Sequence, residues 1–402
     1  MSDFPSNWRE CMLSEVVEKI TSGGTPKADN PHLYGGGIPF LKIDDITSSS
    51  KYLRSHKITI NERGLSESSA KIVPTGTLLL TMYGTIGRCC ITTYPVATNQ
   101  AIASFLGHPE VELEYLYYAL ESKADEFATA SSQTTQANIS AGILKQTPIA
   151  IPPLPEQKKI AEILSGIDLL ILATQRRIDR IRTAQVGLAN SWQKQISLEK
   201  EDGTFGDLIA SIDSGWSPAC DEVPPKSGEW GVLKVSAVSK GYFCEEESKR
   251  LPANLQPRDQ YRIKKNDVLI TRANGNLDLV GRGAIVEEEP RANLLMSDKI
   301  LRLNPNPSSD RNFLLLLLNS RHVRQQIETA VGGSTGAKNI GQSLLRQIST
   351  SVPISEDQAK IGKLSRSLSL TLSVGKKRLN YLVSLKKGLS SDLLSGRKRV
   401  SI

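Results

Sequence analysis

Long apolar runs are missing from this chain of 402 residues. The longest run of large apolar side chains, Phe313 to Leu318, is short, whereas a membrane-spanning helix needs about 20 such residues. The first residues, Met1 to Pro5, contain neither a basic region nor an apolar core, so we expect no signal peptide. The sequence therefore predicts a cytoplasmic protein that does not enter a membrane.

Cysteine and histidine are also scarce. The five cysteines and four histidines are scattered, with no CxxC pair and no zinc-ligand spacing, so the thiols are expected to be incidental residues of a reducing compartment. The chain also lacks the motifs GxxxxGK[ST], HExxH and GxSxG. Two Glu-Ser-Lys triplets, at 121–123 and 247–249, are similar to nuclease sites but follow no suitably placed acidic partner. We therefore expect no catalytic residue and no metal site.

The net charge of +8 is concentrated at one end of the chain. From Ser351 onward there are eleven Lys or Arg against three Asp or Glu, an excess of eight that equals the excess of the whole chain. A basic segment favours binding to a polyanion. A solvated helix face or an acidic protein partner explains the segment equally well.

Two long helical patterns of matching design dominate what is present. The first follows residues 152–157 (Pro-Pro-Leu-Pro-Glu-Gln) and the second follows residues 352–358 (Val-Pro-Ile-Ser-Glu-Asp-Gln), so that Gln157 and Gln358 stand 201 residues apart. Each carries apolar residues at heptad spacing, which is typical of a coiled-coil seam. The first seam contains Ile160, Leu164, Ile167, Ile171, Ile178, Ile181, Leu188 and Trp192, and the second contains Ile361, Leu368, Leu372, Leu379, Leu382, Leu389 and Leu393.

The first helix, from Ile160 to Trp192, forms a rod of roughly 49 Å at 1.5 Å per residue. Thr174 and Gln185 fill gaps in its seam. A helix of this length needs a partner, and the simplest partner of each helix is the other.

The segments before the two helices repeat the same order of elements. Residues 76–81 match 266–271 as strands, the turn 84–88 matches 272–282, residues 98–100 match 297–299, and a helix predicted over 113–127 matches one over 313–327. We therefore expect an α+β fold with two repeated α/β domains, separated by two long antiparallel helices. The expected boundaries are 1–150 and 201–350 for the domains, and 151–200 and 351–402 for the helices.

Polar loops interrupted by glycine are the remaining candidates for function, because their side chains suit pairing with DNA bases and phosphates. Asn and Ser in turns commonly bond their own backbone, so only some of these residues are expected to touch DNA. The candidates in the first domain are Lys42, Tyr83, Thr85, Arg88, Asn99, Gln100, Gln133, Thr134 and Asn138. Those in the second are Lys234, Arg272, Asn274, Asn276, Arg282, Lys299, Ser334, Thr335 and Lys338.

Several of these segments together resemble the specificity subunit of type I restriction-modification systems. The resemblance is carried by residues 152–157 with Ile160 and Ala161, by the turn 84–87 (Gly-Thr-Ile-Gly), by 98–101 (Thr-Asn-Gln-Ala) and by 392–397 (Asp-Leu-Leu-Ser-Gly-Arg). The duplicated layout matches as well, so the resemblance covers the whole chain. The second half departs from the pattern, because Glu356-Asp357-Gln358 lacks the double proline.

The resemblance implies a division of labour in a system of phage defence. Each target recognition domain would read one half of a bipartite site on double-stranded DNA, and the helix pair would set their separation. Two methyltransferase subunits would use S-adenosylmethionine to methylate adenine, and motor-nuclease subunits would use ATP and Mg to translocate and cleave DNA. The chain itself would bind no cofactor and catalyse no reaction. Two alternatives stay open: an unrecognised nuclease, and a stand-alone DNA-binding or scaffold protein without a methyltransferase partner.

Overall fold

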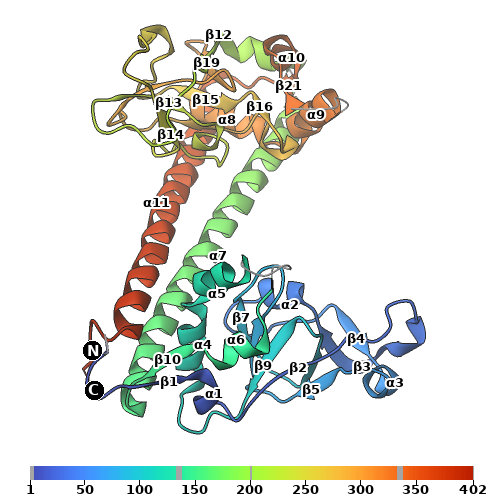
Figure 1. Ribbon diagram of the computed structural model, residues 1–402. Coiled ribbons are helices and arrows are strands. Elements are labelled where there is room, and N and C mark those ends of the chain that lie inside the picture. The colour runs from blue at the N-terminus through green and yellow to red at the C-terminus, as the bar shows by residue number, and fades with distance from the viewer. Residues whose placement is uncertain (1–3, 133–137, 200–201, 333–337, 402) are drawn as a thin grey trace. The chain divides into compact units, whose positions relative to one another are not determined.

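A computed structural model of the chain describes residues 4–132, 138–199, 202–332 and 338–401. The chain divides into two compact units, unit 1 (Met1–Ile171 with Tyr381–Ile402) and unit 2 (Leu172–Asn380). Two long helices, α7 (Leu154–Glu199) and α11 (Ser355–Leu394), contribute residues to both units (Figure 1). Helices and sheets occur together in each unit, so the predicted α+β class is confirmed.

The described residues of unit 1 form two four-stranded sheets and one short strand pair. The first sheet is antiparallel, with the order β2-β9-β6-β7, and the second has the order β4-β3-β8-β5, in which β3 and β8 run parallel. The short strands β1 and β10 form an antiparallel pair, and β10 directly precedes α7 in the chain. The strands are β1 (Arg9–Met12), β2 (Lys19–Ser22), β3 (Tyr34–Leu41), β4 (Ile58–Ile60), β5 (Lys71–Val73), β6 (Leu78–Thr81), β7 (Cys89–Ile91), β8 (Val96–Thr98), β9 (Ile102–Leu106) and β10 (Pro148–Ile151).

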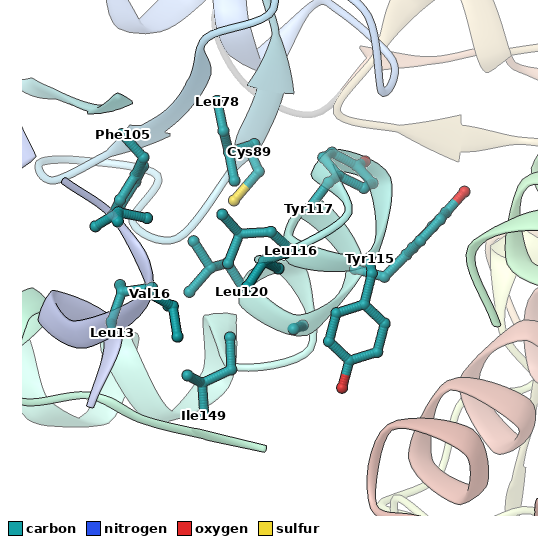
Figure 2. Close-up of a cluster of buried hydrophobic side chains, with 14 of the residues drawn as sticks. Leu13, Val16, Leu78, Cys89, Phe105, Tyr115, Leu116, Tyr117, Leu120 and Ile149 are labelled. Carbon is teal, nitrogen blue, oxygen red and sulfur yellow. The ribbon is translucent and has the colours of Figure 1, made fainter. Parts of the chain in front are cut away.

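The core of unit 1 forms where a helix covers the antiparallel sheet. Figure 2 shows Leu116 and Leu120 of this helix, α4, among Leu78 and Phe105 of the sheet, and all four are fully buried. The predicted helix over 113–127 is in fact two helices, because Ser122 ends the first one. The helices of this part are α1 (Leu13–Val16), α2 (Ile43–Thr47), α3 (Glu62–Ser66), α4 (Leu113–Glu121), α5 (Ala124–Ser132) and α6 (Ala141–Lys145).

Unit 2 repeats the strand order of unit 1. The antiparallel sheet β12-β19-β15-β17 corresponds to β2-β9-β6-β7, and β14-β13-β18, with β13 and β18 parallel, corresponds to β4-β3-β8. The strands are β11 (Asp202–Thr204), β12 (Ile209–Ser214), β13 (Trp230–Leu233), β14 (Ser248–Arg250), β15 (Val268–Thr271), β16 (Ala273–Asn274), β17 (Gly283–Ile285), β18 (Asn293–Leu295), β19 (Ile300–Pro305), β20 (Lys338–Asn339) and β21 (Ser349–Ser351).

The helices of unit 2 follow the same plan. The predicted helix over 313–327 is again two helices, because Asn319 caps the end of the first. Its backbone N–H donates to the Leu316 and Leu317 carbonyls, and its side-chain amide donates to the Leu315 carbonyl at 2.8 Å. These helices are α8 (Arg311–Leu318), α9 (Arg321–Gly332) and α10 (Gln342–Gln347).

Within each unit, α7 and α11 run antiparallel. In unit 2, Ile178 lies beside Gly375, and the side-chain amide of Gln185 donates to the Ser369 hydroxyl at 3.1 Å. Position numbers thus rise along one helix as they fall along the other. All residues of the predicted seams are buried or half-buried, and so is the gap residue Thr174.

In unit 1 the same pairing includes charged groups. The Lys386 amine lies 2.8 Å from Asp168 and 3.0 Å from Glu121. Burial by itself lowers the pKa of Lys386, but the two carboxylates outweigh burial and raise this pKa above its usual value.

The two glutamines that stand 201 residues apart occupy equivalent buried positions. The Gln157 side chain accepts from the Glu112 amide at 2.8 Å and donates to the Pro152 carbonyl at 2.8 Å. The Gln358 side chain accepts from the Asp310 amide at 3.2 Å and donates to the Pro353 carbonyl at 2.8 Å. Each glutamine therefore fastens the start of a long helix to the helix of its own domain, α4 or α8, through that helix's N-cap residue.

Candidate DNA interface

Strand register brings the candidate segments of unit 1 to one end of its two sheets. The end of β6 pairs with the start of β9 (Thr81 with Ile102), and the end of β2 (Ser22) lies beside them. In the second sheet the parallel strands β3 and β8 end together (Leu41 with Thr98). The segments that leave these strands, residues 22–26, 42–43, 82–88, 99–101 and 138–139, form what we call loop edge 1.

Hydrogen bonds join these segments to one another. The Met82 amide donates to Ala101 at 2.8 Å, and the Ile139 amide donates to Met82 at 3.0 Å. Tyr83 and Asn138 form a backbone bridge. Loop edge 1 is therefore a connected surface.

One glycine is required for this arrangement. A Cβ on Gly23 would lie 1.7 Å from the Thr98 carbonyl oxygen, which no side chain permits. The backbone beyond β2 thus packs directly against the end of β8. Next to it, the Thr25 hydroxyl donates to the Gln100 side chain at 2.7 Å.

The structure divides the first-domain candidates into two groups. Lys42 and Arg88 are exposed, and neither belongs to an ion pair within the described part of the chain. Tyr83 and Thr85 are exposed beside Arg88. Asn99 instead accepts from the Ala101 amide at 3.1 Å, as a turn residue does. The candidates Gln133 and Thr134 lie outside the described residues.

Unit 2 builds an equivalent surface, loop edge 2, from residues 215–217, 234–235, 272–282, 297–299 and 338–340. The Arg272 amide donates to Lys299 at 2.8 Å, and the Ile340 amide donates to Arg272 at 2.9 Å, as Met82 and Ile139 do in unit 1. The bridge of Tyr83 with Asn138 becomes the strand pair β16 and β20. Both domains therefore present their loops at the same place in the fold.

The predicted match of 297–299 with 98–100 is wrong by one residue. Ile300 donates to Ser297, as Ile102 donates to Asn99, and the Ser217 hydroxyl donates to Asp298 at 2.5 Å, as Thr25 donates to Gln100. Lys299 is therefore the counterpart of Ala101. The sequence concealed this shift because the side chains that correspond are chemically different.

The second-domain candidates differ in exposure and in their partners. Lys299 is exposed and outside every ion pair found among the described residues, whereas the buried Nε of Arg272 meets no hydrogen-bond acceptor there. Lys234 lies 3.9 Å from Glu222. Lys338 belongs to β20, and Ser334 and Thr335 lie outside the described residues.

Three further candidates are used inside the loop itself. The Asn274 side chain accepts from the Asn276 amide at 2.9 Å, and the Asn276 side chain accepts from the Asp278 amide at 3.0 Å. Arg282 donates to the Asp278 carbonyl at 3.1 Å and to the Asn319 side chain. These contacts shape the loop, so Asn274, Asn276 and Arg282 have structural partners already.

Sequence reasoning missed two features of these surfaces. It did not identify Thr25 and Ser217, which orient Gln100 and Asp298. It also did not identify Arg324 of α9, whose guanidinium bonds to the loop carbonyls of Leu277 and Asp278. Comparison of positions 124 and 324, 200 residues apart, would have drawn attention to Arg324, because the first domain has Ala124 there.

Other kinds of site are not evident in the described residues. No group of three or more His, Cys, Asp or Glu side chains among them is placed to hold a metal ion. None of the helices that the structure describes is both long and apolar enough to span a bilayer. All five thiols are free, and burial raises the pKa of Cys90 to about 12.

Comparison with known proteins agrees with this architecture. Residues 5–183 and 225–382 match the family model described as the type I restriction modification DNA specificity domain. The EcoKI specificity subunit of Escherichia coli K12 is 24% identical over 98% of this chain and 88% of its own length. The EcoEI specificity subunit of Escherichia coli is 30% identical over 57% of this chain, and the match spans only 40% of that relative.

A solved structure supports the fold. The type I restriction-modification S subunit from M. genitalium aligns with a TM-score of 0.61 at 17% identity, covering 98% of this chain and 99% of that one. The family match covers most of the sequence, in both repeats. The chain therefore belongs to the family of type I restriction-modification DNA specificity proteins.

Proposed function

We propose that this chain is the DNA-reading subunit of a type I restriction-modification complex in the cytoplasm. It recognises a bipartite site on double-stranded DNA, one half with loop edge 1 and the other with loop edge 2. Two methyltransferase subunits that use S-adenosylmethionine methylate adenine there, and motor-nuclease subunits that use ATP and Mg cleave unmodified DNA. The chain itself supplies recognition and no chemistry.

The observation that carries this proposal is the duplicated loop edge. Both edges stand on sheets of the same strand order, yet their side chains differ almost throughout. Exposed cations that form no ion pair with another described residue lie on each, Lys42 and Arg88 on the first and Lys299 on the second. Cations and amides on a fixed frame are the groups that contact phosphates and base edges.

The proposed target recognition domains are residues 1–150 and 201–350, and the proposed spacers are 151–200 and 351–402. Support for the spacers comes from the antiparallel contacts of α7 and α11 within each unit. A long helix pair fixes the distance between two half-sites better than a loop does. Each half-site is read by one domain alone.

The test is half-site mapping with the reconstituted complex. The chain is co-expressed with the adenine methyltransferase of the same organism, and methylated adenines are mapped by sequencing. We expect two short specific blocks with a nonspecific spacer. Arg88→Ala and Lys42→Ala should affect the first block alone, whereas Lys299→Ala should affect the second alone.

The control is Lys158→Ala, an exposed lysine on α7 that belongs to neither loop edge. A lost base contact relaxes specificity at one position by about 1–3 kcal/mol, whereas a lost phosphate contact lowers affinity for all sequences and reduces the salt dependence. Cleavage or methylation by the purified chain alone would instead favour the nuclease alternative. Binding without any productive methyltransferase complex would favour a stand-alone role.

A further inference from the structure

The most informative difference between the two loop edges is the turn that follows β6 and β15. In both domains a threonine amide and a glycine amide close this turn. The Thr81 amide donates to the Arg88 carbonyl at 2.9 Å, and the Thr271 amide donates to the Arg282 carbonyl at 2.7 Å. Gly87 and Gly281 donate back to these threonines at 2.9 and 2.8 Å. Six residues lie inside the first closure and ten inside the second. The second turn is thus longer by four residues on the same frame.

The short turn of the first domain is fastened by its own threonine. The Thr81 hydroxyl accepts from the Arg88 amide at 3.0 Å and donates to the Thr85 carbonyl. Thr81 is fully buried, so water does not replace these bonds. No side chain from outside the turn is needed.

The longer turn cannot be fastened in that way. Thr271 is equally buried, but its hydroxyl has no hydrogen-bond partner among the described residues. Arg324 of α9 bonds to the turn instead, donating to the Val280 carbonyl and, at 3.3 Å each, to those of Leu277 and Asp278. One buried guanidinium therefore holds three successive parts of the loop.

Arg324 occupies the place that Ala124 has in the first domain. Gly87 has φ +79°, and a Cβ there would meet Ala124 and Phe127. Gly281 has φ +76°, and a Cβ there would meet Ile327 and the Arg324 guanidinium. An alanine suffices where the turn packs directly on the helix. The arginine fills the space that the longer loop opens.

No carboxylate among the described residues lies within ion-pair distance of Arg324, although Glu328 and Asp278 are near enough to act on its charge. Neither Arg324 nor Arg282 takes part in an ion pair within the ranges that the structure describes, and only 6% of Arg324 is exposed. Burial lowers the pKa of Arg324 to about 10, and burial also lowers that of Arg282. The bonds of Arg324 to carbonyl oxygens use the fork of the guanidinium, which a lysine lacks.

We propose that Arg324 is a positioning residue for sequence discrimination by the second domain. Its side chain bonds to the backbone carbonyls of loop 274–282 and so fixes the shape of that loop, without touching DNA. This rests on the proposed function and adds to it which group sets the specificity of one half-site. The loop, including Asn274 and Asn276 whose side-chain oxygens already bond within it, is then presented to the base edges in one conformation.

The test compares Arg324→Lys and Arg324→Gln with wild type in the reconstituted methyltransferase complex. The substrates are libraries with either half-site randomised, and the readout is the ratio of methylation rates on cognate and single-mismatch sites. We expect the ratio at the second half-site to fall roughly tenfold or more, with the ratio at the first half-site unchanged. Arg324→Lys keeps the charge and loses the fork, so it separates position from charge.

The matched control is Arg321→Ala, an exposed arginine three positions earlier on the same helix, which should change neither ratio. Full discrimination in both Arg324 variants, or an equal loss at both half-sites, would overturn the inference. If the wild-type complex discriminates at neither half-site, the proposed function fails and this inference fails with it. If the wild type discriminates and the variants do so equally, only this inference fails.

Discussion

Replacing Gln157 by leucine tests how the first long helix is joined to its domain. The two side chains have similar volume, so the substitution creates no large cavity. It removes the acceptor of the Glu112 amide and the donor to the Pro152 and Glu110 carbonyls. Because Gln157 is 1% exposed, water does not take its place. At about 1–3 kcal/mol for each of these three groups left without a partner, the expected loss is at least about 3 kcal/mol.

The second repeat provides the matched control. Gln358 makes two of these bonds, and the one to the Asp310 amide is longer at 3.2 Å. Its bond to the Pro353 carbonyl is partly buried, whereas the bond of Gln157 to the Pro152 carbonyl is buried. Gln358→Leu leaves two groups without a partner rather than three and should therefore cost less, from about 2 kcal/mol.

Hydrogen–deuterium exchange with mass spectrometry measures both effects in the intact chain. Peptides that contain Glu112 and Asp310 report the two sites separately. A loss of 3 kcal/mol accelerates exchange through local opening by roughly a hundredfold. Equal acceleration at both sites, or none at Glu112, would refute the reasoning that the number of buried hydrogen bonds lost determines the loss of stability.

Three further predictions follow from contacts within single units and from the helix pair. Thr81→Val should destabilise unit 1 by about 1–3 kcal/mol, because the Arg88 amide loses its buried acceptor, whereas Thr271→Val should be neutral in a urea titration; equal effects would contradict the proposed difference between the turns. Lys386→Met should cost about 2–4 kcal/mol at neutral pH, and, because the folded pKa of Lys386 is raised from 10.5, the difference from wild type should hold below pH 10.5 and shrink as the pH rises through the folded value. Four residues inserted at Thr174 lengthen α7 by about 6 Å, so methylation mapping should show both half-sites unchanged and a spacer, expected at roughly six to eight base pairs, longer by about one or two; an unchanged spacer would show that the helices do not set the distance.

The long helices were predictable from sequence because their signals are local and repeated. Heptad spacing and a proline-containing start indicate α7 and α11, and the offset between Gln157 and Gln358 corresponds to equivalent hydrogen bonds. Strand order was not predictable, because β2 pairs with β9 across 79 intervening residues and neither strand specifies its partner. The breaks after α4 and α8 were missed because one polar residue ends each helix inside a continuous apolar pattern.

The loop edges were predictable as a set of segments but not as contacts. Asn266 shows why: it adopts φ +75° where the first domain has Gly76 at +79°. Asparagine tolerates this conformation, so the equivalent positions of the two domains have different residue types. The role of Arg324 was hidden for the same reason, since its partners are backbone carbonyls that every sequence possesses.

Because identical backbone bonds close the two turns, the length of the loop between them can change without a change in the surrounding strands. Extending a closed loop from six to ten residues costs only about 0.5 kcal/mol in chain entropy. The frame at Thr271 and Arg282 stays in register whatever lies between. Insertions at this point are therefore nearly neutral for folding, and a new loop needs only one side chain from a neighbouring helix to give it a single shape.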